Sequence, residues 1–411
     1  MFPADRRRIR GVVVIDSHSG YHRRMSKHDF STAEFESRRS RVRDELRARQ
    51  LDWLIAIHPV SIHWLTGSDA KSYQEFQCLF IPADPGPLTV LTRQGEVDEF
   101  QADAWVDAVV GYGGGENEDP LGPFERVATR LGVLRGRVGL EVPAYYLHPH
   151  QYLALRALMG PALVAEPTQL IADLKLVKSP AEQAYIREAA ARADRAQAAF
   201  ERALRVGATE LELAGVVCQS LLSQGSFLAA SPLNVVTGER SCFSHGAPTE
   251  RRLRAGDFGN IEFGATCRRY TSTIGRNFCL GEPTPRMRQL HQLVLDASEA
   301  CRAEIRAGVP ATRPHAAAKQ VLEAAGVGHG RVHTTGYGLA PGFPPTWGEP
   351  LHMLADSRYT LEAGMVLSVE PPLYLGEERL GARLIDNVVV TANGCEILSQ
   401  HPRDLFVAAA S

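Results

Sequence analysis

The sequence predicts two unlike domains, an α/β domain followed by a larger α+β domain. Up to about residue 165, short apolar runs of strand length alternate with helix-like segments. After about residue 180, long helical segments are separated from runs that are typical of antiparallel strands. A chain of 411 residues is long enough for two or three domains, each with its own core.

We expect the chain to divide into four segments. The first is a leader whose apolar stretch GVVVI is too short for the core of a signal peptide, so we expect it to be flexible. The last begins where helical, Ala-rich sequence follows Ser179 and Pro180. The segments are a leader at 1–31, an α/β domain at 32–165, a linker at 166–180 and an α+β domain at 181–408.

In the first domain, a charged segment with few breakers indicates a helix, and short apolar runs that end at Pro or at a turn indicate strands. The turn ADPGP at 83–87 predicts that the runs on either side are consecutive strands. Strands that alternate with helices favour a three-layer α/β unit. The expected elements are a helix at 32–50, strands at 51–59, 78–82, 88–92 and 137–143, and a helix at 150–159.

The second domain opens with a clear helix-start signal. Ser179 suits the N-cap, Pro180 suits the first helical position, and Glu182 can return a hydrogen bond to the cap. The helices and strands that follow lie in separate groups, which favours a curved, largely antiparallel sheet. The expected helices are 181–204, 209–223, 284–306 and 312–325, and the expected strands are 233–238, 258–264, 267–280, 364–375 and 382–391.

Composition excludes several classes of partner. A formal net charge of −2 argues against nucleic acid or an anionic membrane as a partner held by bulk charge. No apolar run approaches the roughly 18 residues of a membrane span. The 7 cysteines show no CxxC spacing, which indicates free thiols in a reducing cytoplasm. We therefore expect a cytoplasmic protein.

Several stretches resemble the pita-bread metallopeptidases, the superfamily of methionyl and Xaa-Pro aminopeptidases, prolidases and creatinases. They are LKLVKSPAEQAYIREAAARAD, RAGDFGNIEFGATCRRYTSTIGRNF, VHTTGYGLA, GMVLSVEPPLY and GARLIDNVVVT. The resemblance covers about residues 32–408 and implies a pita-bread C-terminal domain with a smaller creatinase- or prolidase-like N-terminal domain. It also implies a homodimer in which the N-terminal domain lies near the partner's active site.

The resemblance points to the positions at which such enzymes hold two metal ions with two Asp, one His and two Glu. A two-metal site needs carboxylates to offset the charge and fill the coordination shells. Neutral Thr is a poor ligand, Tyr binds only after losing a proton, and Ile cannot bind. We therefore expect no metal and no other cofactor. In this chain the positions are Glu262, Thr273, Tyr337, Glu370 and Ile385.

Among metal-free members, the chain is most similar to ectoine hydrolase and then to creatinase, which cleave C–N bonds in amidine-type molecules. Creatinase shares His245 and Glu370. Because Glu370 and Arg383 depart from the ectoine hydrolase pattern, a sister activity on another cyclic amidine or amide stays open. The features shared with ectoine hydrolase are Glu262, Arg268-Arg269-Tyr270, the segment PPTWGE at 344–349 and the segment WLTG at 64–67.

The expected chemistry is hydrolysis of an amidine or amide. Glu262 can attack the electrophilic carbon directly or act as a base on water, and a structural ion pair is the alternative. His245 is the expected proton shuttle, since the pKa of a histidine is ordinarily near neutral. Tyr337 can donate a hydrogen bond to the developing charge or simply fill the space of the lost ligand.

Further residues are expected to hold the substrate. Glu370 can pair with a cationic amidinium group or balance Arg383 or Arg276. Both arginines are candidates to hold a substrate carboxylate through a bidentate fork. Trp347 can pack on a flat ring or wall the cleft. Tyr73, in the first domain, is expected to complete the pocket of a partner subunit.

The sequence therefore predicts a metal-independent hydrolase of a C–N bond in a small cyclic amidine, converting ectoine or 5-hydroxyectoine to N-acetyl-diaminobutyrate. The enzyme alternatives are a creatinase-like amidinohydrolase and an Xaa-Pro peptidase-like enzyme. The alternative from another class is a non-catalytic protein that binds small molecules or peptides.

Overall fold

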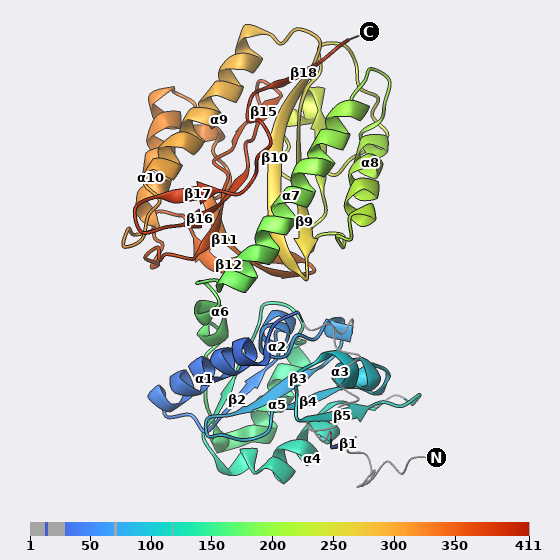
Figure 1. Cartoon of the computed structure of the whole chain (residues 1–411), viewed down its shortest axis with the longest axis vertical. Coiled ribbons are helices and arrows are strands. Elements are labelled where there is room, and N and C mark those ends of the chain that lie inside the picture. The colour runs from blue at the N-terminus through green and yellow to red at the C-terminus, as the bar shows by residue number, and fades with distance from the viewer. Residues whose placement is uncertain (1–12, 15–28, 70–71, 117, 411) are drawn as a thin grey trace. The chain divides into compact units, whose positions relative to one another are not determined.

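The computed structural model describes residues 13–14, 29–69, 72–116 and 118–410 (Figure 1). The chain divides into two compact units, Met1–Leu174 and Lys175–Ser411. Among the described residues, no helix combines the length and the apolar character that crossing a membrane requires. All 7 cysteines are free thiols.

The first unit is built on a seven-stranded mixed sheet in the order β1-β5-β4-β3-β2-β6-β7. Leu54 and Ile55 are neighbours on β2 yet enter different hydrophobic cores, so the sheet is buried on both faces. The strands are β1 (Val13–Val14), β2 (Trp53–Ala56), β3 (Cys78–Pro82), β4 (Thr89–Arg93), β5 (Ala108–Tyr112), β6 (Val138–Leu140) and β7 (Leu163–Ala165). The helices are α1 (Thr32–Ala48), α2 (Pro59–Thr66), α3 (Val97–Asp103), α4 (Leu121–Leu131), α5 (Pro149–Met159) and α6 (Leu170–Leu174).

Three local features of this unit differ from expectation. Within the predicted leader, Val13–Val14 form β1, which pairs antiparallel with β5; the other leader positions up to residue 28 lie outside the described residues. The strand predicted at 51–59 is shorter, because Pro59 occupies the first position of α2. Leu170–Leu174, inside the predicted linker, form α6.

The second unit contains a nine-stranded sheet in the order β17-β16-β13-β11-β10-β9-β8, with β12 beside β11 and β18 beside β10. All its strand pairs are antiparallel except β10 with β18, as the sequence predicts for the main sheet. Its strands are β8 (Asn234–Thr237), β9 (Phe258–Cys267), β10 (Tyr270–Leu280), β11 (Gly336–Phe343), β12 (Thr346–His352), β13 (Val366–Val369), β16 (Asp386–Val390), β17 (Cys395–Ile397) and β18 (Phe406–Ala408). A separate two-stranded sheet pairs β14 (Leu373–Leu375) with β15 (Leu380–Ala382).

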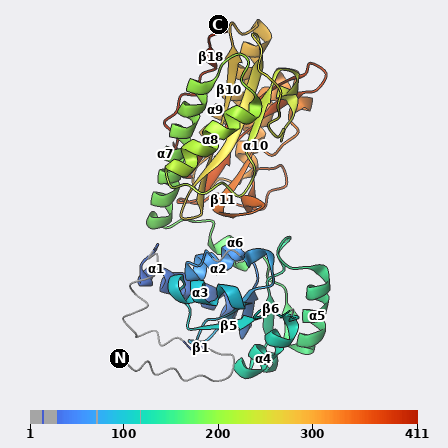
Figure 2. The same ribbon diagram turned by 90° about the vertical axis from the view of Figure 1, so that its right-hand side faces the viewer.

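Two helix pairs flank this sheet (Figure 1). They are α7 (Pro180–Ala203) with α8 (Glu210–Ser223), and α9 (Pro285–Ala303) with α10 (Thr312–Ala324). Figure 1 shows α7 running alongside β9 and β10, and Figure 2 shows the same unit from the side, with α8 next to α7. The first pair shares one hydrophobic core with β9 and β10, and the second pair shares another with β13 and β16.

The alternation of side chains on β9 and β10 decides what faces away from the helices. Ile261 and Phe263 enter the core with α7 and α8, so Glu262 between them lies on the opposite face. Ile274 enters the same core, and Thr273 therefore also faces away from it. This helix-free face carries the candidate site.

The helix start predicted at Ser179 is confirmed. The hydroxyl of Ser179 accepts a hydrogen bond from the Glu182 backbone N–H at 3.2 Å, and the Glu182 carboxylate accepts one from the Ser179 N–H at 2.8 Å. The strand expected at 364–375 is instead divided into β13 and β14, because Pro371 and Pro372 cannot donate to a strand ladder.

Candidate active site

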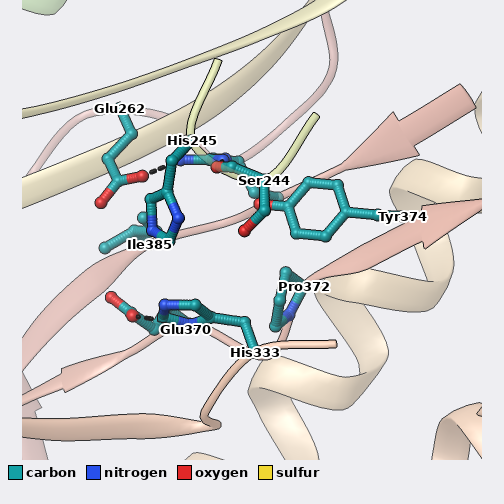
Figure 3. Close-up of a pocket in the computed structure, with 9 residues that line it drawn as sticks. Ser244, His245, Glu262, His333, Glu370, Pro372, Tyr374 and Ile385 are labelled. Carbon is teal, nitrogen blue, oxygen red and sulfur yellow. Dashed lines mark hydrogen bonds and ion pairs between the residues drawn. The ribbon is translucent and has the colours of Figure 1, made fainter. Parts of the chain in front are cut away.

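Two adjoining cavities in the second unit share His245, Glu262 and His333 among their lining residues. The larger cavity has a volume of about 270 Å³ and is walled on one side by Tyr337 and Trp347. Figure 3 shows the surroundings of the smaller cavity, with Glu262 beside His245 and Glu370 beside His333. Each of these carboxylates is at most 8% exposed, so the site is a buried cluster of acids and histidines.

The two histidines come from separate loops and face each other. His245 follows the short helical turn at Gly238–Cys242, and His333 precedes β11; their ring centroids are 5.2 Å apart. Burial lowers the pKa of His245, with a smaller contribution from Arg383. Burial also lowers the pKa of His333, helped by His245. Both rings are therefore neutral at neutral pH and available as bases.

Glu370 follows the end of β13 and is held in its protonated form. Its side chain is 4% exposed, and burial raises its pKa to about 8. The Ser368 hydroxyl donates to Glu370 Oε2 at 2.6 Å, and His333 Nδ1 lies 3.4 Å from Glu370 Oε1. At neutral pH this carboxyl is thus an acid beside a neutral imidazole.

Glu262 is compensated by a buried cation. The Asn234 amide donates to Glu262 Oε2 at 3.0 Å, and the Arg383 guanidinium forms an ion pair with the same oxygen. Arg383 also donates to the carbonyl of Ser244, the residue before His245. Glu262 is therefore part of an ion pair that also supports the His245 loop.

Tyr337 and Trp347 form a second hydrogen-bonded pair. The Trp347 indole N–H donates to the Tyr337 hydroxyl at 3.0 Å. Because an indole N–H can only donate, the hydroxyl proton of Tyr337 is left to point elsewhere, and Glu370 is its acceptor nearby. Burial and the Glu370 carboxylate raise the pKa of Tyr337. Trp347 itself packs over Gly264, where a Cβ would lie 3.1 Å from the ring.

We expect Trp347→Phe to destabilise the second unit by about 1 to 2 kcal/mol, because it removes the donor to Tyr337 and leaves a small void. Urea denaturation measures the change. The control is Trp105→Phe, since the Trp105 N–H has no partner among the described residues and the exchange there removes packing without removing a hydrogen bond. Equal losses for the two variants would contradict a stabilising role for the Trp347–Tyr337 hydrogen bond.

Among the predicted substrate residues of the second unit, Arg276 lines neither cavity. Arg276 is 2% exposed, and its guanidinium is fully engaged: it pairs with Asp386 at 2.8 Å and donates to the carbonyl oxygens of Gly275, Ile385, His401 and Pro402. It therefore holds backbone segments together instead of a substrate carboxylate. Tyr73 belongs to the first unit, where its ring packs edge-on against Tyr146 at 6.0 Å. Its expected role across a dimer stays a prediction.

The prediction missed some residues that line or support the site. His352 lines the larger cavity, and its ring lies 5.7 Å from that of Tyr337. Asn234 and Ser368 bind the two carboxylates directly. Ser368 could have been found from the sequence, because it lies two residues before Glu370 and residues two apart on a strand share a face. His352 lies on β12, a strand that is not among those expected from the sequence.

An antiparallel sheet flanked by two helix pairs, with a buried acid and histidine site on the face away from them, defines the pita-bread class of proteins. Residues 184–392 match the model of metallopeptidase family M24, and residues 38–177 match that of the creatinase/prolidase N-terminal domain. The chain belongs to metallopeptidase family M24. The predicted fold class, a pita-bread domain with a smaller N-terminal domain, is confirmed.

Proteins similar to this chain are peptidases. An uncharacterized peptidase of Staphylococcus aureus (strain MW2) is 26% identical over 368 residues, which span 89% of this chain and 99% of the relative. The structure of a dipeptidase PepE from Mycobacterium ulcerans is similar with a TM-score of 0.79 and 28% identity, covering 92% of this chain and 99% of that one. An Xaa-Pro dipeptidase from Bacillus anthracis has the same fold, with a TM-score of 0.79 and 23% identity over 91% of this chain and 99% of that one.

These comparisons contradict the predicted function. The relatives are peptidases of a metallopeptidase family, so the expectation of a metal-independent hydrolase of ectoine or of another non-peptide C–N bond is wrong. The segment PPTWGE, which suggested ectoine hydrolase, has a structural explanation here. Its tryptophan, Trp347, lies on β12 and packs against Gly264 and Tyr337.

The family implies metal ions, and the side chains at the ligand positions can be tested against them. The Thr273 hydroxyl accepts a hydrogen bond from the Asn387 amide at 2.8 Å, and Ile385 offers no ligand atom. Glu262 is already paired with Arg383. Among the described residues, no group of three or more His, Cys, Asp or Glu side chains is placed to hold a metal ion. The residues present do not fit a two-metal centre.

Proposed function

We propose that this chain hydrolyses the amide bond of a short peptide of dipeptide size, an activity of the kind named for its peptidase and dipeptidase relatives. The observation that carries the proposal is the 3.4 Å contact between His333 Nδ1 and Glu370 Oε1 on the wall of the smaller cavity. Burial shifts the pKa values of these two groups in opposite directions, so that one pH provides both a base and an acid.

The proposed reaction uses this pair for both proton transfers. Neutral His333 accepts a proton as water adds to the carbonyl carbon of the scissile bond. Protonated Glu370 donates its proton to the leaving nitrogen as the C–N bond breaks. The products are an amine and a carboxylic acid, and the proton on His333 returns to Glu370 across their contact, so that both groups regain their starting states.

The other site residues have supporting roles in this proposal. His245 faces His333 across the site and is proposed to relay the proton from the attacking water to His333. Trp347 and Tyr337 form the wall against which a substrate side chain packs. Glu262, paired with Arg383, is proposed to hold the His245 loop in place and not to act as a nucleophile, because its charge is already compensated.

The release of free amino acid from dipeptides tests the proposal. The protein is incubated with Ala-Pro, Gly-Pro and Ala-Ala, once with a chelator and once with Mn²⁺. We expect release from at least one dipeptide. His333→Gln should lower kcat/KM by about a hundredfold or more, because it removes the general base. His329→Gln, which changes an exposed histidine, should leave kcat/KM unchanged. Absence of release from every dipeptide in both solutions would contradict the proposed activity.

A second candidate is a protein that binds short peptides without cleaving them. It is favoured by the ion pair between Glu262 and Arg383, which neutralises a carboxylate at a metal-ligand position. It predicts that calorimetry detects binding of a dipeptide, that Trp347→Ala weakens this binding, and that no product accumulates. Turnover that is lost in His333→Gln would exclude it.

A further inference from the structure

A buried carboxylate outside both cavities contacts the loop that carries His245. Glu210 is the first residue of α8, and its exposed fraction is 0%. It lines neither cavity, and the proposed chemistry does not use it. A carboxylate in the first turn of a helix is stabilised in its charged form by the helix dipole. Glu210 is thus a buried hydrogen-bond acceptor inside the second unit.

The two oxygens of Glu210 bind opposite ends of the loop at 238–249. Oε1 accepts hydrogen bonds from the backbone N–H of Thr237 at 2.9 Å and from its hydroxyl at 2.8 Å. Oε2 accepts from the backbone N–H of Thr249 at 3.0 Å and from its hydroxyl at 2.7 Å, and it also pairs with Arg240. One side chain thus joins the residue before the loop to the last residue of the loop.

Further contacts fix the loop between these ends. Arg240 donates to the carbonyl of Ala247 at 2.7 Å, and the Asn260 amide donates to the carbonyl of Ser241 at 2.9 Å. Gly246 packs directly on β8, where a Cβ would lie only 2.1 Å from Val236 Cγ1. With both ends tied and its middle packed, the backbone of the loop that carries His245 is held in place.

We propose that Glu210 is a positioning residue of the active site, which holds the loop at 238–249 so that His245 faces His333. The inference rests on the proposed function only in that His245 belongs to the site of that function. The geometry that supports it is the pair of tied loop ends and does not depend on which peptide is cleaved.

Glu210→Gln separates this role from simple packing, because it keeps the volume and removes one acceptor. Whichever way the amide is turned, its NH₂ group meets either the Thr237 donors or the Thr249 and Arg240 donors. One end of the loop is then released. We expect amide exchange in 238–249 to become about tenfold faster or more, as measured by mass spectrometry. We also expect the His245 ring, with its burial reduced, to titrate at higher pH in histidine NMR.

Glu182→Gln is the matched control. Glu182 is likewise buried at the start of a helix, where it accepts hydrogen bonds from Ser179 and Tyr270. This variant should lose thermal stability without faster exchange in 238–249 and without a shift in the titration of His245. If Glu210→Gln behaves as Glu182→Gln does, the positioning role is overturned.

A milder variant covers the case in which Glu210→Gln does not fold. Thr249→Val removes the hydroxyl donor to Glu210 and keeps the backbone one, so exchange in the loop should rise by a smaller factor. Unchanged exchange in this variant would also count against the inference. Neither measurement uses a substrate, so failure of the positioning role is distinguishable from failure of the proposed peptidase activity.

Discussion

Arg383→Met is expected to destabilise the second unit by about 3 kcal/mol or more, because it leaves a buried carboxylate without its cation. Both partners are almost fully buried, with Arg383 2% and Glu262 8% exposed. Among the described residues, the Asn234 amide would then be the hydrogen-bond donor left to the Glu262 carboxylate. The carbonyl of Ser244 would also lose its donor, which loosens the loop of His245. Urea denaturation measures the loss.

A double-mutant cycle separates the ion pair from packing. Glu262→Gln removes the charge that Arg383→Met leaves uncompensated, so the double variant should be more stable than the sum of the two losses predicts, by about 1 to 3 kcal/mol. The control is Arg187→Met, because Arg187 pairs with Glu396 at the surface, where the side chains are 42% and 52% exposed. This exchange should cost about 1 kcal/mol or less. Equal losses in the free energy of unfolding for Arg383→Met and Arg187→Met would refute the buried-pair explanation.

Glu370 is expected to make the stability of the second unit fall as pH rises from about 4.5 to about 8. Its pKa is 4.5 when unperturbed and about 8 in the folded protein. Between these values the folded state keeps a proton that the unfolded state has lost. The stabilisation that Glu370 contributes is therefore fully present below pH 4.5 and is lost as the pH rises through 8. The loss from this group is roughly 3 to 5 kcal/mol.

Glu370→Gln tests this by resembling the protonated carboxyl at every pH. Relative to wild type, the variant should gain stability steadily as pH rises and stop gaining above about pH 8. Free energies of unfolding between pH 4.5 and pH 9 provide the comparison, and contributions from titrating groups that do not contact Glu370 are common to both proteins. Glu377→Gln, at an exposed position, should run parallel to wild type. A constant difference between Glu370→Gln and wild type across this range would contradict the proposed protonation state.

The parts of the fold that could be predicted are those encoded by local patterns. The capping residues Ser179 and Glu182 predicted the start of α7, and the apolar runs at 258–264 and 267–280 predicted β9 and β10. β12 was missed because its segment contains Pro and Gly, which favour turns, and its pairing with β11 is irregular in register. Val13–Val14 were missed because two residues carry no periodicity of their own.

Part of the candidate site could be predicted as well. Glu262, His245, Tyr337, Glu370 and Trp347 do gather around the two cavities. Arg276 could not be separated from Arg383 by sequence, because both are arginines next to candidate site residues. The alternation on β10 turns Arg276 toward backbone carbonyls, whereas Arg383 reaches Glu262.

The sequence by itself determined the order of the two units and which of the longer elements are helices or strands, since these depend on local patterns. It also determined which side chains stand at the family's metal-ligand positions, since this depends on residue identity alone. The tertiary structure alone decided the protonation and pairing of those side chains. Burial at the end of β13 makes Glu370 an acid, and the meeting of distant segments gives Glu262 its cation, Arg383. Burial and ion pairing depend on which segments meet, and no single stretch of the sequence encodes that.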